Sequence, residues 1–226
     1  MGIAIRLEHV DREYGRTEES ALVQALRDVT LEIPAGALAI LKGPSGSGKS
    51  TLLNVIGAVD RPTGGRVWLG EREITKLRES GLTLLRRQSI GFIFQFFNLI
   101  PTLTVAENIA FPLQLLGTPR DEVRTRVDEV LGEIGLGARA RHFPNELSGG
   151  EMQRVAIGRA IVHRPSLILA DEPTGNLDTH TGEKILDSLR SVHETYRPTI
   201  VMATHSERAA SFGSRVIQIQ DGTIAR

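Results

Sequence analysis

Short apolar runs alternate with longer amphipathic segments along this chain. The runs lie at residues 3–7, 37–43, 89–95, 166–172 and 199–205 and end at turn-forming or polar residues. Runs of this length that are rich in Ile and Val are typical of strands buried on both faces. Strands that alternate with helices indicate right-handed crossovers and a parallel sheet, whose ligand crevice lies beyond the carboxyl ends of the strands. The pattern predicts an α/β fold.

Three of the amphipathic segments predict helices. Residues 118–135 have apolar residues at helical spacing, acids in the first turn and Pro119 at the first helical position. A second helix is expected to begin near Thr104, because Glu107 stands three residues later as in a capping box. A third is expected around residues 185–192, where apolar residues line one face.

One region departs from this alternation. Residues from about 96 to about 163 show helical patterns and few strand signals, whereas about 1–95 and 164–226 hold the strand runs. We therefore expect one domain over residues 1–226, in which a mainly helical subdomain is inserted into the sheet core. The chain shows no internal repeat and no low-complexity tract.

The composition excludes several classes of function. Lys and Arg total 27 and Asp and Glu total 27, so there is no basic field for nonspecific nucleic-acid binding, and we expect no nucleic-acid partner. The absence of cysteine excludes disulfides, thiolate metal sites and cysteine nucleophiles. No apolar run approaches the ~18 residues that cross a bilayer, and the first residues lack the layout of a signal peptide. We expect a cytoplasmic protein.

A loop of small residues at 43–51 fits the phosphate-loop pattern G-x-x-x-x-G-K-[ST] and lies between two apolar segments. Small residues let successive backbone N–H groups point at an anion, Lys49 reaches the outer phosphates, and the Ser50 hydroxyl suits Mg²⁺. A flexible turn is the plainer alternative, but it explains neither the lysine nor the strand–loop–helix context. The predicted nucleotide site comprises Gly43, Pro44, Ser45, Gly46, Ser47, Gly48, Lys49, Ser50 and Thr51.

Two adjacent acids end another apolar run. Asp171 is suited to hold Mg²⁺ through water, and Glu172 to take a proton from an attacking water or to polarise it. Alone, such a pair is more typical of the solvated start of a loop. Beside a phosphate loop, the catalytic interpretation is favoured.

A second turn of small residues, Ser148, Gly149 and Gly150, opens a helical segment and predicts a second set of N–H groups aimed at an anion. A single nucleotide does not need two such turns on one molecule. A head-to-tail dimer, in which the turn of one copy completes the phosphate site of the other, is the economical interpretation. An ordinary capping box between Ser148 and Glu151 is the plainer one, and both hold together.

These motifs, in this order, resemble the nucleotide-binding subunits of ABC transporters over nearly the whole chain. The resemblance rests on the phosphate loop, Gln95, LSGGEMQR at 147–154, LILADE at 167–172, GNLD at 175–178 and His205. Residues 94–109 and 171–178 resemble the branch of MacB, LolD and FtsE type ATPases, which pairs a separate ATPase subunit with a membrane partner. The resemblance implies a P-loop NTPase (RecA-like) parallel-sheet core with an N-terminal antiparallel β region and the inserted helical subdomain.

The resemblance also implies roles for four single residues. Tyr14 would stack on adenine, and Gln95 would contact Mg²⁺ and the attacking water. His205 would act near the γ-phosphate, and Asp178 would link the two sites across a dimer. Plainer alternatives are an exposed loop tyrosine, an amide at a strand end, a structural histidine and a helix cap.

The resulting hypothesis is an ATPase that dimerises around two Mg·ATP, with Lys49, Gln95, Glu172 and His205 as its catalytic residues. Its motion would reach an integral membrane permease subunit at the inner face of the cell membrane, for export, lipoprotein release or mechanotransmission. Phe96, Phe97 and Leu99 either line a groove for that partner or belong to the core. A regulatory ABC ATPase that transports nothing stays open, and a soluble ABC ATPase acting on nucleic acid or ribosomes is less compatible with the neutral, single-domain chain.

Overall fold

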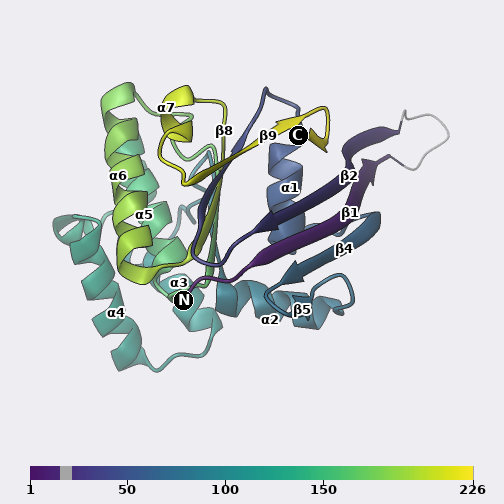
Figure 1. The fold of residues 1–226 in the computed structure, drawn as a ribbon. Coiled ribbons are helices and arrows are strands. Elements are labelled where there is room, and N and C mark those ends of the chain that lie inside the picture. Colours follow the sequence, from purple (N-terminus) through teal and green to yellow (C-terminus); the bar gives the residue numbers. More distant parts are fainter. Residues whose placement is uncertain (16–21, 226) are drawn as a thin grey trace.

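The structure is a computed structural model that describes residues 1–15 and 22–225. Its centre is a six-stranded sheet in the order β10-β9-β3-β8-β7-β6 (Figure 1). Within this sheet every neighbouring pair among the described residues is parallel except β9–β10. The strands are β3 (Leu38–Lys42), β6 (Ile90–Ile93), β7 (Leu167–Asp171), β8 (Thr199–Thr204), β9 (Arg215–Gln220) and β10 (Thr223–Ile224). The parallel pairing confirms the predicted α/β fold.

A second, antiparallel sheet has the order β2-β1-β4-β5 and matches the β region that the resemblance implied. It consists of β1 (Ile5–Tyr14), β2 (Val23–Ile33), β4 (Gly64–Leu69) and β5 (Arg72–Glu73). The first apolar run belongs to this sheet, so its prediction as a strand buried on both faces was wrong. Side chains of β1 alternate between buried and exposed, because one face of an antiparallel sheet packs on the core and the other meets solvent.

Helices cover both faces of the parallel sheet. They are α1 (Lys49–Ile56), α2 (Glu79–Ser89), α3 (Val105–Leu115), α4 (Arg120–Glu133), α5 (Gly149–Ile161), α6 (Thr179–Tyr196) and α7 (Glu207–Ala210), with 3₁₀ turns η1 (Gly137–Arg139) and η2 (Pro144–Glu146). In Figure 1, α4, α5 and α6 lie on one side of the sheet, and α1 lies on the other, toward the antiparallel sheet.

Alternation along β3 explains how one short strand supports two cores. Ile40 packs into a cluster with residues of α3 to α6, whereas Ala39 and Leu41 pack into a cluster with α1, α2 and the antiparallel sheet. Residues 96–163, all of them described, contain helices, turns and irregular segments but no strand. Their apolar residues pack in the same cluster as Ile40 and other residues of the parallel sheet. The packing therefore does not separate the helical subdomain from the sheet core, and its boundaries stay a prediction.

Local signals placed the helix starts well. Thr104 caps α3, its N–H donates to Glu107 over 2.8 Å, and the N–H of Glu107 donates back to Thr104 over 3.3 Å, which confirms the capping box. The apolar residues expected on one face of the helix around 185–192 are buried on α6: Ile185, Leu186, Leu189 and Val192. Pro119 is the residue before α4 and not its first residue, because its ψ of 143° is extended.

Candidate functional site

The phosphate loop joins the end of β3 to the start of α1, the context that the sequence predicted. Gly48 precedes the helix with φ of 103°, a left-handed conformation that side chains disfavour. A Cβ on Gly43 would lie 2.1 Å from the carbonyl oxygen of Ile219, so the start of the loop also requires glycine. The fold therefore brings bare backbone and a helix N-terminus to the carboxyl end of a central strand.

Lys49 points back across this loop and is 6% exposed. Its Nζ donates to the carbonyl oxygens of Gly43 and Pro44, each over 2.8 Å. The nearest carboxylate oxygen paired with it belongs to Glu172, 4.0 Å away. The hydrogen-bond partners of this buried ammonium group are thus neutral carbonyl oxygens. The hydroxyl of Ser47, also buried, has no hydrogen-bond partner in the described structure, so the loop presents a cation and a polar group suited to phosphate.

The acid pair lies beside this lysine at the end of β7. Burial raises the pKa of Asp171 above its ordinary value, and a hydrogen bond with Ser50 opposes that rise. Asp171 Oδ1 is buried without a hydrogen-bond partner in the described structure. An orphaned carboxylate oxygen beside a serine hydroxyl is a donor set that fits Mg²⁺. The described residues contain no cluster of three or more His, Cys, Asp or Glu side chains that forms a metal site by itself.

Glu172 connects the lysine with a histidine from the next strand. Its Oε2 lies 3.0 Å from Nδ1 of His205, which follows β8 and has a side chain 63% exposed. The backbone of Glu172 is left-handed, with φ of 46°, and its N–H donates to Ala203 over 3.0 Å. Because β8 lies between β3 and β7, three predicted catalytic residues, Lys49, Glu172 and His205, meet at one edge of the sheet.

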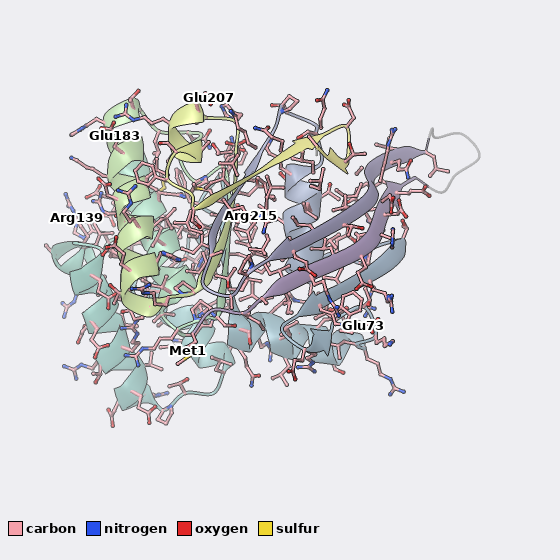
Figure 2. All side chains as sticks on the ribbon, viewed as in Figure 1. Met1, Glu73, Arg139, Glu183, Glu207 and Arg215 are labelled. Carbon is pink, nitrogen blue, oxygen red and sulfur yellow. The ribbon has the colours of Figure 1, made fainter. Side chains whose placement is uncertain are left out.

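A cavity of about 250 Å³ opens beside Glu172 and His205. Its wall includes Gly175 and Asp178, and Glu183 and Arg208 line its rim. Figure 2 shows Glu183, on α6, at the same end of the molecule as Glu207 of α7, which pairs with Lys42 of β3. This edge of the sheet is open to solvent at the exposed His205, and the adjacent surface carries charges of both signs.

Gln95 lies just past β6, close to this cavity. Its carbonyl accepts a hydrogen bond from Asn176 over 2.9 Å. Its Nε2 lies 3.0 Å from where a Cβ on Gly175 would stand. The structure thus brings Gln95 next to the loop that follows Glu172. Asn176 belongs to the GNLD motif, but no individual role was predicted for it, because its partner is 81 residues away.

Asp178 caps α6 and accepts a hydrogen bond from the N–H of Thr181 over 3.0 Å. Hydrogen bonds from Thr181 lower the pKa of Asp178 below its ordinary value. Asp178 is therefore a helix cap, as the plainer alternative proposed. A role across a dimer remains a prediction.

The Ser148 turn caps α5, and its capping box with Glu151 is present. The Ser148 N–H, which donates to Glu151 over 2.8 Å, is the main cause that lowers the pKa of that carboxyl. A Cβ on Gly150 would lie 2.4 Å from Thr181 Cγ2, so the start of α5 packs closely on α6. Within the described part of the chain, no hydrogen bond or ion pair joins residues 148–151 to residues 43–51.

Tyr14 is not joined to the phosphate loop by any hydrogen bond of the described residues. Its hydroxyl donates to Asp60 over 2.7 Å, and the guanidinium of Arg12 lies 4.3 Å from its ring centroid. Its partner across the strand ladder, Val23, does line a cavity of about 310 Å³ against the loop.

Other residues of this second cavity escaped the sequence analysis. They come from β2 and from the turn before β10: Gln24, Ala25, Arg27, Asp221 and Gly222. The N–H of Gly222 also donates to the carbonyl of Ser47 over 3.0 Å. No motif marks these positions, since only the fold brings them to the loop.

The groove expected near Phe96 exists but has different walls. A cavity of about 410 Å³ is lined by apolar residues with arginines among them: Phe92, Phe94, Ile100, Phe111, Leu115, Arg86, Arg87 and Arg159. Leu99 instead packs against the core, as the alternative foresaw. Phe96 is 72% exposed but is not part of this cavity. Phe92 and Phe94, two residues apart at the end of β6, lie on the side of the strand that faces the groove.

Comparisons with known proteins agree with this geometry. A family model described as ABC transporter matches residues 26–175. The lipoprotein-releasing system ATP-binding protein LolD of Geobacter metallireducens is 43% identical over 218 residues, which cover 96% of this chain and 97% of LolD. The macrolide export ATP-binding/permease protein MacB of Aggregatibacter actinomycetemcomitans is 43% identical over 220 residues, 97% of this chain but 34% of MacB.

A solved structure is similar over the whole fold. It is the dimeric, post-hydrolysis state of the ATP-binding cassette MJ0796 bound to ADP and Pi, and MJ0796 comes from Methanocaldococcus jannaschii. The TM-score is 0.90 at 44% identity, with 98% of this chain and 97% of that chain covered.

Proposed function

This chain belongs to the ABC transporter family and is an ATPase of its ATP-binding type, and we propose that two copies close around two Mg·ATP to drive a separate integral membrane permease subunit. One observation carries the proposal. The chain has two turns of small residues that open helices, at 43–51 and 148–150, and no hydrogen bond or ion pair of the described residues joins them within one copy. A second copy, related by two-fold symmetry, supplies the missing half of each site. The dimeric MJ0796 cassette supports this arrangement.

The phosphate end of the site is built around Lys49. When a triphosphate binds, its oxygens replace the carbonyls of Gly43 and Pro44 as partners of the ammonium group, because charged acceptors form the stronger hydrogen bonds. Ser50, Asp171 and Gln95 are the residues that would hold Mg²⁺, which neutralises charge on the phosphate oxygens. The N-terminus of α5 from the other copy adds a second positive helix end.

Glu172 is the base of the proposed mechanism. Lys49 and His205 flank its two oxygens, so the carboxylate is held in one orientation and is ready to accept a proton from water. When both ring nitrogens of His205 carry protons, Nδ1 donates to Glu172 and the other nitrogen can donate to the γ-phosphate. Phosphoryl transfer needs mainly such positioning and charge neutralisation.

The proposed partner is a membrane protein. No helix in the described residues is long and apolar enough to cross a membrane. In MacB, by its name, ATP-binding and permease functions share one protein, and this chain corresponds to about a third of it. The groove lined by Phe92, Phe94 and Phe111 suits the apolar face of a partner helix, and its arginines suit an acidic end. Docking there would hold the chain at the inner face of the cell membrane, for export, lipoprotein release or mechanotransmission.

Dimer formation tests this proposal directly. Glu172→Gln keeps the size and polarity of the side chain but removes the base, so it should bind Mg·ATP without turnover and accumulate as a dimer in size-exclusion chromatography. Lys49→Ala serves as the control and should stay monomeric. A monomeric Glu172→Gln variant at saturating Mg·ATP would contradict shared sites.

A further inference from the structure

The turn that follows Gln95 has an unfavourable backbone. Phe97 and Asn98 both have left-handed conformations, with φ of 60° and 48°, although neither is glycine. Asparagine tolerates this region, but a bulky side chain such as that of Phe97 rarely adopts it, since Cβ approaches the following carbonyl oxygen. Such a conformation persists only where its surroundings hold it. Contacts from elsewhere in the chain must therefore keep this turn in place.

Arg159 of α5 makes those contacts. One amino group of its guanidinium donates to the carbonyl of Asn98 over 2.5 Å and the other to the carbonyl of Phe97 over 2.8 Å. Burial lowers the pKa of the guanidinium below its ordinary value. Among the described residues it forms no ion pair, in contrast to Arg126, which pairs with two glutamates. The partly buried guanidinium of Arg159 thus has no counter-ion among the described residues and donates instead to two backbone carbonyls.

The same helix touches this region at further points. The Phe97 ring lies 3.9 Å from where a Cβ on Gly149 would stand, at the start of α5. Near its other end, the carbonyl of Ala160 would be 2.2 Å from a Cβ on Gly91 of β6. The segment that carries Gln95 is therefore bounded on both sides by contacts with α5, the helix that the Ser148 turn begins.

We propose that Arg159 is a positioning residue for ATP hydrolysis: its guanidinium fixes the turn of Phe97 and Asn98, holds Gln95 beside Asn176, and makes Gln95 follow any movement of α5. The proposal rests on the function proposed above through the role of Gln95. In the shared site, the Ser148 turn of α5 contacts the nucleotide on the other copy. Arg159 thereby links the γ-phosphate of that nucleotide to the Gln95 of its own copy.

Steady-state kinetics of Arg159→Met test the link. The variant keeps an apolar stem of similar length but has no donor, so Gln95 loses its fixed position. We expect kcat to fall about 10- to 100-fold, as for a misplaced catalytic group, whereas KM for ATP changes little because the phosphate loop is untouched. Arg159→Lys, which keeps the charge and one donor direction, should recover part of the loss.

A double-mutant cycle separates this role from a purely structural one. If Arg159 acts through Gln95, Arg159→Met should cost almost nothing further in Gln95→Ala. Hydrogen exchange should be faster at residues 96–98 in Arg159→Met and unchanged at residues 43–51. Arg126→Met is the matched control, because Arg126 Nε donates to the carbonyl of Val162 just past α5, far along the chain from Gln95. It should lose stability but keep kcat.

The outcomes are distinguishable. An unchanged kcat in folded Arg159→Met, or additive losses in the double variant, would overturn the proposal. If Arg159→Met does not fold, Arg159→Lys replaces it in the same measurements. An unchanged kcat of Arg159→Lys, or additive losses in its double variant with Gln95→Ala, would then overturn the proposal. Normal hydrolysis by Gln95→Ala would overturn the link as well, while the dimer of Glu172→Gln would show whether the proposed function still stands.

Discussion

The two turns proposed to bind the nucleotide, residues 43–51 and 148–150, differ in what surrounds them. The phosphate loop follows β3 of the parallel sheet and ends at a lysine that is 6% exposed, with Glu172 and His205 close by. In the other turn Ser148 is exposed and Gly150 is buried, and Ser148 and Glu151 satisfy one another through a capping box. No catalytic side chain proposed above accompanies it; it presents only the first N–H groups of α5. In the proposed mechanism, the phosphate loop lies beside the catalytic residues and the Ser148 turn completes the site of the other copy.

The largest expected effect concerns the phosphate loop. Lys49→Ala should bind ATP at least about 30-fold more weakly, since truncating one member of a buried charge pair costs about 2–5 kcal/mol. Isothermal titration calorimetry on the monomer measures this affinity. Undiminished binding would show that the loop is not the phosphate site.

An intermediate effect is expected at the Ser148 turn. Ser148→Glu adds a negative charge where the other copy's γ-phosphate would lie, so hydrolysis should fall about 10- to 100-fold through lost transition-state stabilisation. ATP affinity of the monomer should stay within about twofold, because the phosphate loop is a separate site. A large loss of affinity in the monomer would place both turns on one nucleotide and contradict the comparison. Stopped-assay ATPase rates and calorimetry supply the two numbers.

The smallest expected effect is on stability. Ser148→Ala removes the cap of α5 and should lower the free energy of unfolding by about 1 kcal/mol. Thr104→Ala removes an equivalent cap from α3 and should cost a similar amount. Urea denaturation measures both. Only Ser148→Ala should also slow hydrolysis; equal ATPase rates in the two variants would mean that Ser148 is a cap and nothing more.

Sequence reasoning succeeded where the signal is local. The phosphate loop, the capping boxes at Thr104 and Ser148 and the apolar face of α6 depend on residues a few positions apart, and each lies where predicted. The proximity of Glu172 and His205 could also be predicted, because the carboxyl ends of neighbouring parallel strands lie at one edge of the sheet.

Prediction failed where contacts span long distances in the chain. The first apolar run joins the antiparallel sheet through partners that its own pattern does not reveal. The walls of the groove depend on the register of β6 and on α3, so neighbours of the expected residues line it. Asn176 and Arg159 bind backbone carbonyls 81 and 61–62 residues away, and a carbonyl leaves no trace in the sequence.

Mixing two impaired variants tests most directly whether each nucleotide is shared between copies. Lys49→Ala lacks a phosphate site and Ser148→Glu lacks a completing turn, but a mixed pair contains one intact composite site. An equimolar mixture should regain about a quarter of the wild-type sites, whereas Lys49→Ala mixed with the Lys49→Ala/Ser148→Glu double variant should regain none. A mixture of the two single variants as inactive as its parts would contradict the account.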